Sequence, residues 1–113
     1  MFDEAISEFS IAIAKEDLSL HRNNRGLALY HIGEYERAKI DYDEAIKKNP
    51  DEALVYYNRG NVFLNQGEYE LAYHDYDTAI KKDPKNPKFY HQKGLAFEAQ
   101  AYQDPKHVDV NLQ

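Results

Sequence analysis

Histidines, serines and paired aspartates are the residues of this sequence that could carry catalysis or hold a metal. The histidines lack the spacing of metal ligands, and the serines lie outside any nucleophile motif. The aspartates of each pair are two residues apart, so on a helix they face different ways and make poor acid/base pairs. We therefore expect no enzyme activity, no cofactor and no metal site. The residues concerned are His21, His31, His74, His91, His107, Ser7, Ser10, Ser19, Asp41, Asp43, Asp75 and Asp77.

The composition is that of a globular protein of one domain. The 113 residues are 30% charged and 42% hydrophobic, and none is cysteine, which excludes disulfides and zinc–thiolate sites. The net charge of −6 argues against nucleic acid and anionic membranes as partners. No apolar run approaches the roughly 20 residues that span a bilayer, and residues 1–4 do not resemble a secretory signal. We expect an intracellular, cytoplasmic location.

The sequence contains an internal repeat. Residues 19–52 align with 53–86, and half of the aligned positions are identical. Residues 87–102 repeat the first half of this unit, and residues 1–18 repeat its second half with a connection that is one position shorter. Residues 103–113 have no periodicity and are expected to form an irregular tail. The sequence thus predicts a repeat domain over 1–102, with two full units between two partial ones.

Each unit has the pattern of two helices. Apolar residues of the second half recur at helical spacing, Gly33 and Gly67 stand where a helix C-terminus tolerates positive φ, and Pro50 and Pro84 follow the second helix. Repeated Lys-Lys pairs in the last turn complement the helix dipole. The expected helices are about 3–15, 19–32, 35–48, 52–66, 69–82 and 87–102.

These motifs resemble the tetratricopeptide repeat. The resemblance covers roughly residues 2–100, and it implies an all-α fold, an α-α superhelix of antiparallel hairpins with about six helices. In the second full unit it is carried by Tyr56, Gly60, Phe63, Gly67, Tyr69, Ala72, Tyr76, Ala79 and Pro84. In the first it is carried by Gly26, Leu29, Gly33, Tyr35, Ala38, Tyr42, Ala45 and Pro50.

Several positions depart from the family pattern. Arg22 stands where the family favours a large aromatic residue, Arg25, Arg59 and Lys93 stand where it usually has leucine, and Asp17 takes the place of the proline. The array also begins midway through a unit and lacks the second half of its third. We expect an excised piece of a longer array, or an array that completes itself with another copy.

The resemblance implies a concave groove lined by the first helix of each hairpin, and hence a module that binds an extended peptide or a partner protein. Carried onto this chain, the groove residues are Asn23, Asn24, Leu27, His31, Leu54, Tyr57, Asn58, Asn61, Asn65, Lys88, His91, Gln92 and Leu95.

Asn24, Asn58 and Gln92 form a column of amides, since they occupy the same position in successive units. A side-chain amide both donates and accepts, as a peptide backbone does. The column is similar to the asparagine ladder in the tetratricopeptide superhelix of protein O-glycosyltransferases. One hypothesis is that the three amides hold a peptide backbone, with Leu27, Tyr57 and Leu95 contacting its side chains. The other is that they cap or bridge neighbouring helices.

Family members that grip the acidic C-terminus of heat-shock chaperones use Lys, Asn and Arg at defined groove positions. No register of this chain supplies that set, because leucine, tyrosine and asparagine occupy the positions that need cations. The sequence therefore disfavours such a carboxylate clamp.

Two charge patterns admit two interpretations each. The Arg25/Arg59/Lys93 column recurs with Asp41 and Asp75, which favours salt bridges that fix the stacking over a basic stripe that reads an acidic ligand. Residues 1–20 carry a net charge of −4 and residues 79–93 one of +4. These ends are either ordinary solvated surface or, since each partial unit leaves an apolar face open, surfaces by which copies stack head to tail.

Three functions follow as hypotheses. The first is a peptide-binding adaptor or scaffold that uses the groove. The second is a structural element embedded in a larger assembly through end-to-end stacking, and the third is the substrate-presenting arm of a larger enzyme.

Overall fold

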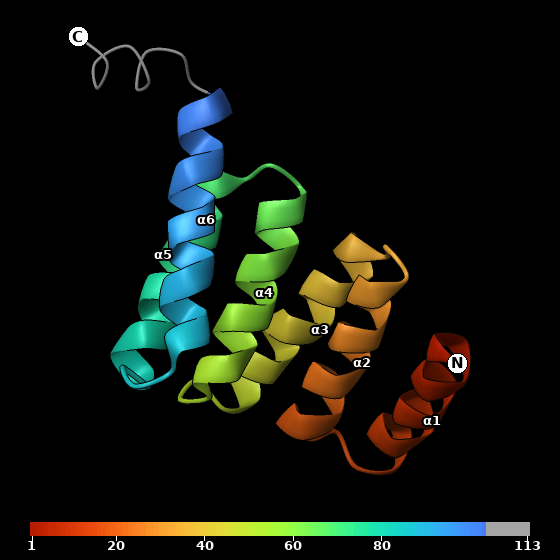
Figure 1. The fold of residues 1–113 in the computed structure, drawn as a ribbon. Helices are drawn as coiled ribbons and strands as arrows, with labels where there is room; N and C mark the ends of the chain where they lie inside the picture. The colour runs from red at the N-terminus through yellow and green to blue at the C-terminus, as the bar shows by residue number, and fades with distance from the viewer. Residues whose placement is uncertain (104–113) are drawn as a thin grey trace, which may run out of the picture.

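A computed structural model describes residues 1–103, which form six helices (Figure 1). They alternate in direction along the stack, so that α2 with α3 and α4 with α5 make two complete hairpins. α1 precedes the first of these hairpins in the chain, and α6 follows the second. The helices are α1 (Phe2–Lys15), α2 (Ser19–His31), α3 (Tyr35–Lys48), α4 (Ala53–Asn65), α5 (Tyr69–Lys82) and α6 (Pro87–Gln103).

The helix limits follow the signals in the sequence. Gly33 and Gly67 have φ of 82° and 76°, so each hairpin turns at the residue type that adopts this conformation without strain. The side chain of Asn86 accepts a hydrogen bond from the backbone N–H of Lys88 at 3.0 Å, which caps the start of α6. α6 includes Gln103, which the sequence assigns to the irregular tail. The rest of that tail, 104–113, lies outside the described residues.

Within each hairpin a tyrosine ring packs directly on a glycine. A Cβ added to Gly26 would lie 2.7 Å from Cε1 of Tyr42, and one added to Gly60 would lie 2.7 Å from Cε1 of Tyr76. Both tyrosines are fully buried. Small residues of the second helices share this interface, and four of them have no exposed surface: Ala38, Ala45, Ala72 and Ala79. The close approach of the two helices therefore depends on the absence of a side chain at the glycine.

Arginines join the two helices of each hairpin, and Arg59 also reaches the hairpin before its own. The guanidinium of Arg25 donates two hydrogen bonds of 2.7 Å to Asp41, and that of Arg59 donates two of 2.8 Å to Asp75. Arg59 also donates to Asp43 on α3, at 2.9 Å. The salt bridges favoured by the sequence are thus confirmed, and Arg59 links three helices.

The same link recurs at both ends of the stack with different chemistry. Arg25 donates to the hydroxyl of Ser10 on α1, at 3.1 Å, because Ser10 occupies the place of Asp43 in the partial unit. Lys93 on α6 contacts Asp77 on α5 at 2.7 Å. Each first helix is therefore held to the second helix that precedes it in the chain.

Arg22 and Asp17, which depart from the family pattern separately, form one ion pair. Two hydrogen bonds of 2.8 Å join the Arg22 guanidinium to the Asp17 carboxylate. Hydrogen bonding from Arg22 is the main cause that lowers the pKa of Asp17 to about 2. In the next unit Tyr56 takes the place of Arg22, and its hydroxyl donates to the carbonyl of Pro50. The first unit thus makes the same connection with two charged residues.

The first helices lie on the inner side of the stack. α4 contacts both α2 and α6, whereas within residues 1–103 the second helices α1, α3 and α5 do not touch one another. The stack therefore curves towards α2, α4 and α6, which form its concave face. None of the described helices is long and apolar enough to cross a membrane.

Removal of the buried Asp75 should lower stability far more than removal of the half-buried Asp77. We expect Asp75→Ala to lower the free energy of unfolding by about 3 kcal/mol, since it leaves the half-buried Arg59 with only Asp43. Asp77→Ala, which removes the less buried partner of Lys93, should cost at most about 1 kcal/mol. Urea denaturation measures both changes. Equal losses for the two variants would contradict a special stabilising role for the Arg59–Asp75 pair.

Candidate functional site

The groove residues predicted from the sequence all lie on α2, α4 and α6, but they differ in how far they reach solvent. Asn23 and Asn58 are buried. Four others are half-buried: Asn24, Tyr57, Asn61 and Gln92. The exposed ones are Leu27, His31, Leu54, Asn65, Lys88, His91 and Leu95. A ligand in the groove would therefore meet mainly leucine, histidine and amide side chains.

The amides of this face bridge neighbouring first helices. Nδ2 of Asn58 donates to Oδ1 of Asn23 at 3.0 Å, which ties α4 to α2. Nε2 of Gln92 donates to Oδ1 of Asn61 at 2.9 Å, which ties α6 to α4. The side chain of Asn65 likewise donates to the hydroxyl of Tyr30. Helix bridging, one of the two hypotheses for the amide column, is therefore observed for Asn58 and Gln92.

The bridge between Asn58 and Asn23 leaves hydrogen-bonding groups unused. Within residues 1–103, neither Oδ1 of Asn58 nor Nδ2 of Asn23 has a hydrogen-bond partner, and neither is among the fully buried unpaired polar atoms. The pair, although largely buried, therefore keeps one acceptor and one donor that no residue within 1–103 uses.

Asn24 does not join this chain of amides. It lines a cleft of about 260 Å³ between α1 and α2, at the acidic end of the stack. The other lining residues are Phe2, Ala5, Phe9, Leu27, Ala28 and His31. The ring of Phe2 stacks on that of His31 with centroids 5.0 Å apart. The cleft is mainly apolar, and Asn24 and His31 are the polar side chains of its wall.

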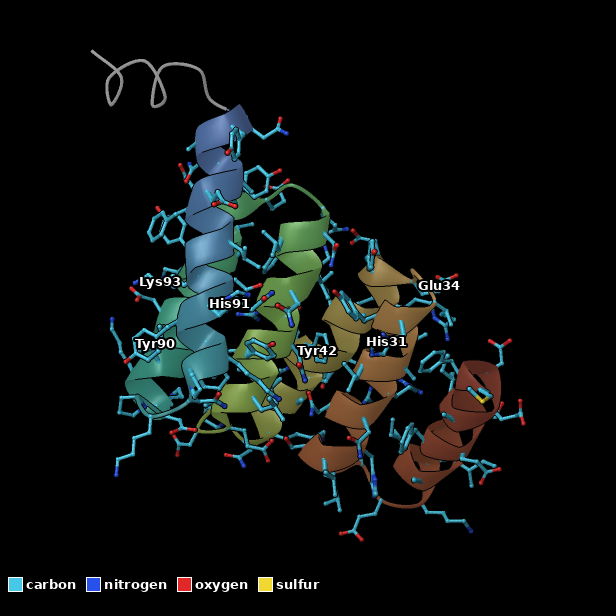
Figure 2. The ribbon with its side chains drawn as sticks, viewed as in Figure 1. His31, Glu34, Tyr42, Tyr90, His91 and Lys93 are labelled. Carbon is cyan, nitrogen blue, oxygen red and sulfur yellow. The ribbon has the colours of Figure 1, made fainter. Side chains whose placement is uncertain are left out.

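Aromatic and histidine side chains complete the inner face. The ring of Tyr57 packs against Phe89 and Tyr76, with centroids 5.1 and 6.0 Å apart, so only part of it can touch a ligand. Figure 2 shows His31 on α2 and His91 on α6, on either side of α4, and both are exposed.

Most cations of the first helices are neutralised by aspartates of the stack. Arg22, Arg25 and Arg59 all bind aspartate. Lys93 binds Asp77, at the edge of α6 away from α4 (Figure 2). Among the described groove residues only Lys88 carries a full positive charge, and it makes no ion pair within residues 1–103. The groove is thus nearly free of net charge.

A buried tyrosine hydroxyl without a partner is a feature that the sequence analysis missed. The hydroxyl of Tyr76 donates to Oδ1 of Asn61 at 2.6 Å, but that of Tyr42 has no hydrogen-bond partner among residues 1–103. The cause is visible in the repeat, since Leu27 holds the position of Asn61 in the preceding unit and cannot accept a hydrogen bond. Burial raises the pKa of both tyrosines, so both hydroxyls stay protonated.

No cluster of three histidine or acidic side chains suited to a metal ion occurs within residues 1–103. The arrangement on the inner face is suited to non-covalent binding through hydrogen bonds and apolar contact.

Comparisons with protein families identify two matching models. The tetratricopeptide repeat model matches residues 53–86, and a model described as TPR repeat matches residues 26–67. Together they cover residues 26–86, more than half of the chain. A search of curated proteins finds no significant match.

Solved structures of tetratricopeptide domains have the same fold. The first such domain of Spaghetti (RPAP3), bound to the HSP90 peptide SRMEEVD, is 22% identical, with a TM-score of 0.85 over 88% of this chain and 80% of that one. The second such domain of human RPAP3, in complex with the HSP70 peptide SGPTIEEVD, is 24% identical, with a TM-score of 0.79 over 84% of this chain and 80% of that one. These similarities establish an all-α helical-repeat solenoid.

The two buried tyrosines should respond oppositely to loss of the hydroxyl. We expect Tyr42→Phe to raise the free energy of unfolding by about 1 kcal/mol, because it removes a buried polar group without a partner. Tyr76→Phe should lower it by about 1 kcal/mol, because it breaks the hydrogen bond to Asn61. Thermal and urea unfolding of both variants measure the difference. A loss of stability in both would contradict this account of Tyr42.

Proposed function

Because this chain belongs to the tetratricopeptide repeat family, we propose that it binds partner proteins, as an adaptor or scaffold, by holding an extended peptide in its concave groove. Recognition here needs no covalent step, so the proposed role is binding rather than catalysis. The net charge of −6 makes a protein a more suitable partner than nucleic acid or an anionic membrane.

The observation that carries the proposal is the spare donor and acceptor of the Asn23–Asn58 pair. An extended peptide presents N–H and C=O groups that pair with such atoms whatever its sequence. The bridge between the two side chains also fixes their orientation before a ligand arrives, which lowers the entropy cost of binding. The amide pair would therefore contribute to both the stack and the ligand.

Apolar contact would supply much of the affinity. Leu54 and Leu95 lie exposed on successive first helices of the groove. Neighbouring packed helices are about 8–10 Å apart, so three of them span roughly 20 Å. An extended chain rises about 3.3 Å per residue, so a peptide of about 6–8 residues would cross the groove.

The two solved relatives hold acidic peptides, but the groove of this chain favours uncharged ones. Its arginines are bound to aspartates, and Lys88 lies alone at one end. A ligand carboxylate placed between α2 and α4 would lose its hydration without gaining a cation in exchange.

The choice of variant matters, because Asn58→Ala would also remove a buried bridge between helices. Leu54 and Leu71 provide a cleaner pair. Leu54 is 47% exposed on α4 in the groove, and Leu71 is 50% exposed on α5, a second helix. The two leucines differ mainly in the face of the stack that they occupy.

We expect Leu54→Ser to weaken binding of a groove peptide about tenfold, the effect of losing roughly 1.4 kcal/mol of apolar contact. Leu71→Ser should leave the affinity unchanged. The ligand would be selected from a displayed library of short random peptides, and its affinity measured by isothermal titration. Selection of no peptide, or equal effects of the two variants, would reject the groove as the binding site.

The acidic chaperone peptides provide a second test. We expect SRMEEVD and SGPTIEEVD to bind this chain at least tenfold more weakly than the selected peptide, because no cation between α2 and α4 is free to meet a carboxylate. Fluorescence anisotropy with labelled peptides measures this. Tighter binding of either acidic peptide would show that the Arg–Asp pairs open for a ligand.

A further inference from the structure

We propose that Ser10 on α1 is a phosphorylation site, and that Arg25 on α2 binds the phosphate. A protein kinase would transfer the terminal phosphoryl group of a nucleoside triphosphate to Oγ of Ser10. The new Oγ–P bond forms as the bond from phosphorus to the nucleoside diphosphate breaks, and the hydroxyl proton passes to a base of the kinase. The site is marked by the column in which Ser10 stands, by unneutralised cations beside it and by an open cavity at Arg25.

Ser10 stands in a column of the repeat that elsewhere holds aspartate. Asp43 on α3 accepts a hydrogen bond of 2.9 Å from Nη1 of Arg59, and Asp77 on α5 binds a lysine of α6 at 2.7 Å. Oγ of Ser10 accepts a hydrogen bond of 3.1 Å from Nη1 of Arg25, the corresponding atom. Ser10 therefore occupies the place of an anion but carries no charge.

Arg25 has donors left for a phosphate. Its Nε and Nη2 each donate to Asp41, which leaves Nη1 directed at Ser10. A phosphate on Ser10 would offer this nitrogen three strong acceptor oxygens in place of one hydroxyl oxygen. The column is also accessible, since the side chain of Asp43 is 60% exposed while it binds Arg59, and Ser10 is half-exposed. The hydroxyl is therefore open to modification, and the product has a binding partner in place.

The charges at the joint between α1 and the hairpin of α2 and α3 leave a positive excess that a phosphate would cancel. Four cations meet two carboxylates there: Arg22, Arg25, Arg37, Lys48, Asp17 and Asp41. At the matching positions of the next unit two cations meet three carboxylates: Arg59, Lys82, Asp43, Asp51 and Asp75. A phosphoserine carries a charge of about −1.5 to −2 at pH 7, close to the excess at the first joint.

An open cavity adjoins Arg25 between α2 and α3. Its volume is about 170 Å³, and Arg37 at its wall makes no ion pair within residues 1–103. In the second hairpin Phe63 replaces Leu29, another wall residue, and Lys39 packs on the Phe63 ring with Nζ 5.4 Å from the centroid. The first hairpin thus has smaller side chains at this place, and the space beside Arg25 would admit a phosphate without displacing a neighbour.

Full-length chains phosphorylated at Ser10 alone or at Ser7 alone, made by incorporating phosphoserine during translation, test the binding of the phosphate. Phosphate on Ser10 should raise the thermal midpoint by about 5 °C, the effect of one charge-assisted interaction in a domain of this size. Phosphate on Ser7, an exposed residue of the same helix, should leave the midpoint unchanged. A midpoint for the chain phosphorylated at Ser10 that is no higher than the other would overturn the proposal.

Phosphorus NMR gives a readout that a general change in stability would not move. The phosphate on Ser7 should titrate with a second pKa of about 6. The guanidinium of Arg25 should lower the second pKa of the phosphate on Ser10 below that value, because it favours the dianion. Equal pKa values for the two phosphates would contradict their assigned surroundings.

Two unmodified variants separate charge from hydrogen bonding at the same position. Ser10→Asp supplies the carboxylate that the column has elsewhere, whereas Ser10→Asn has nearly the same shape without the charge. We expect the thermal midpoint of Ser10→Asp to lie about 4 °C above that of Ser10→Asn. A midpoint for Ser10→Asp no higher than that of Ser10→Asn would contradict the excess of cations at this joint.

Peptide mass mapping of the full-length protein from its own cells, with phosphatases inhibited, tests whether the modification is made. We expect phosphate on Ser10. Coverage of this peptide with Ser10 unmodified would reject it as a phosphorylation site, whatever the stability of the phosphorylated chain.

Discussion

The contact between a glycine and a tyrosine ring is the constraint on which each hairpin depends. Arg25 and Arg59 each directly precede the glycine, and Asp41 and Asp75 each directly precede the tyrosine. Once the ring rests on the glycine, the neighbouring guanidinium and carboxylate are brought together, with two hydrogen bonds in each pair. Close packing, made possible by the missing side chain, thus sets the geometry of the ion pairs, and the ion pairs hold the two helices of each hairpin together.

The repeat preserves connections rather than residues. Position 22 and its counterpart at 56 both bind the residue that follows the preceding second helix, once through an arginine and an aspartate and once through a tyrosine and a proline carbonyl. The link from Arg59 to Asp43 is made in the unit before by Arg25 and Ser10. A residue that departs from the family pattern is therefore best interpreted together with the residue that it contacts.

The sequence predicts the helices closely, because the spacing of apolar residues, the turn glycines and the prolines each determine the conformation of the chain around them. It predicts the Arg–Asp pairs as well, since both partners recur with the repeat. The amide contacts escape this reasoning. The repeat suggests that Asn24, Asn58 and Gln92 align with one another, yet the observed bonds join Asn58 to Asn23 and Gln92 to Asn61. A short side chain bonds to the nearest partner on the next helix, and that depends on how the helices cross and which rotamers they allow.

Stacking and the proposed ligand recognition would draw on the same side chains. Each arginine that grips an aspartate of the stack is a cation withdrawn from the groove. The amides are shared differently, because an amide has more than one hydrogen-bonding group and can bridge two helices while still facing a ligand. A stack held together by Arg–Asp pairs and amide bridges is therefore left with a neutral groove, whose selectivity must come from leucines, histidines and unused amide atoms. The chemistry that joins the helices would thus also limit which peptides the proposed groove could hold.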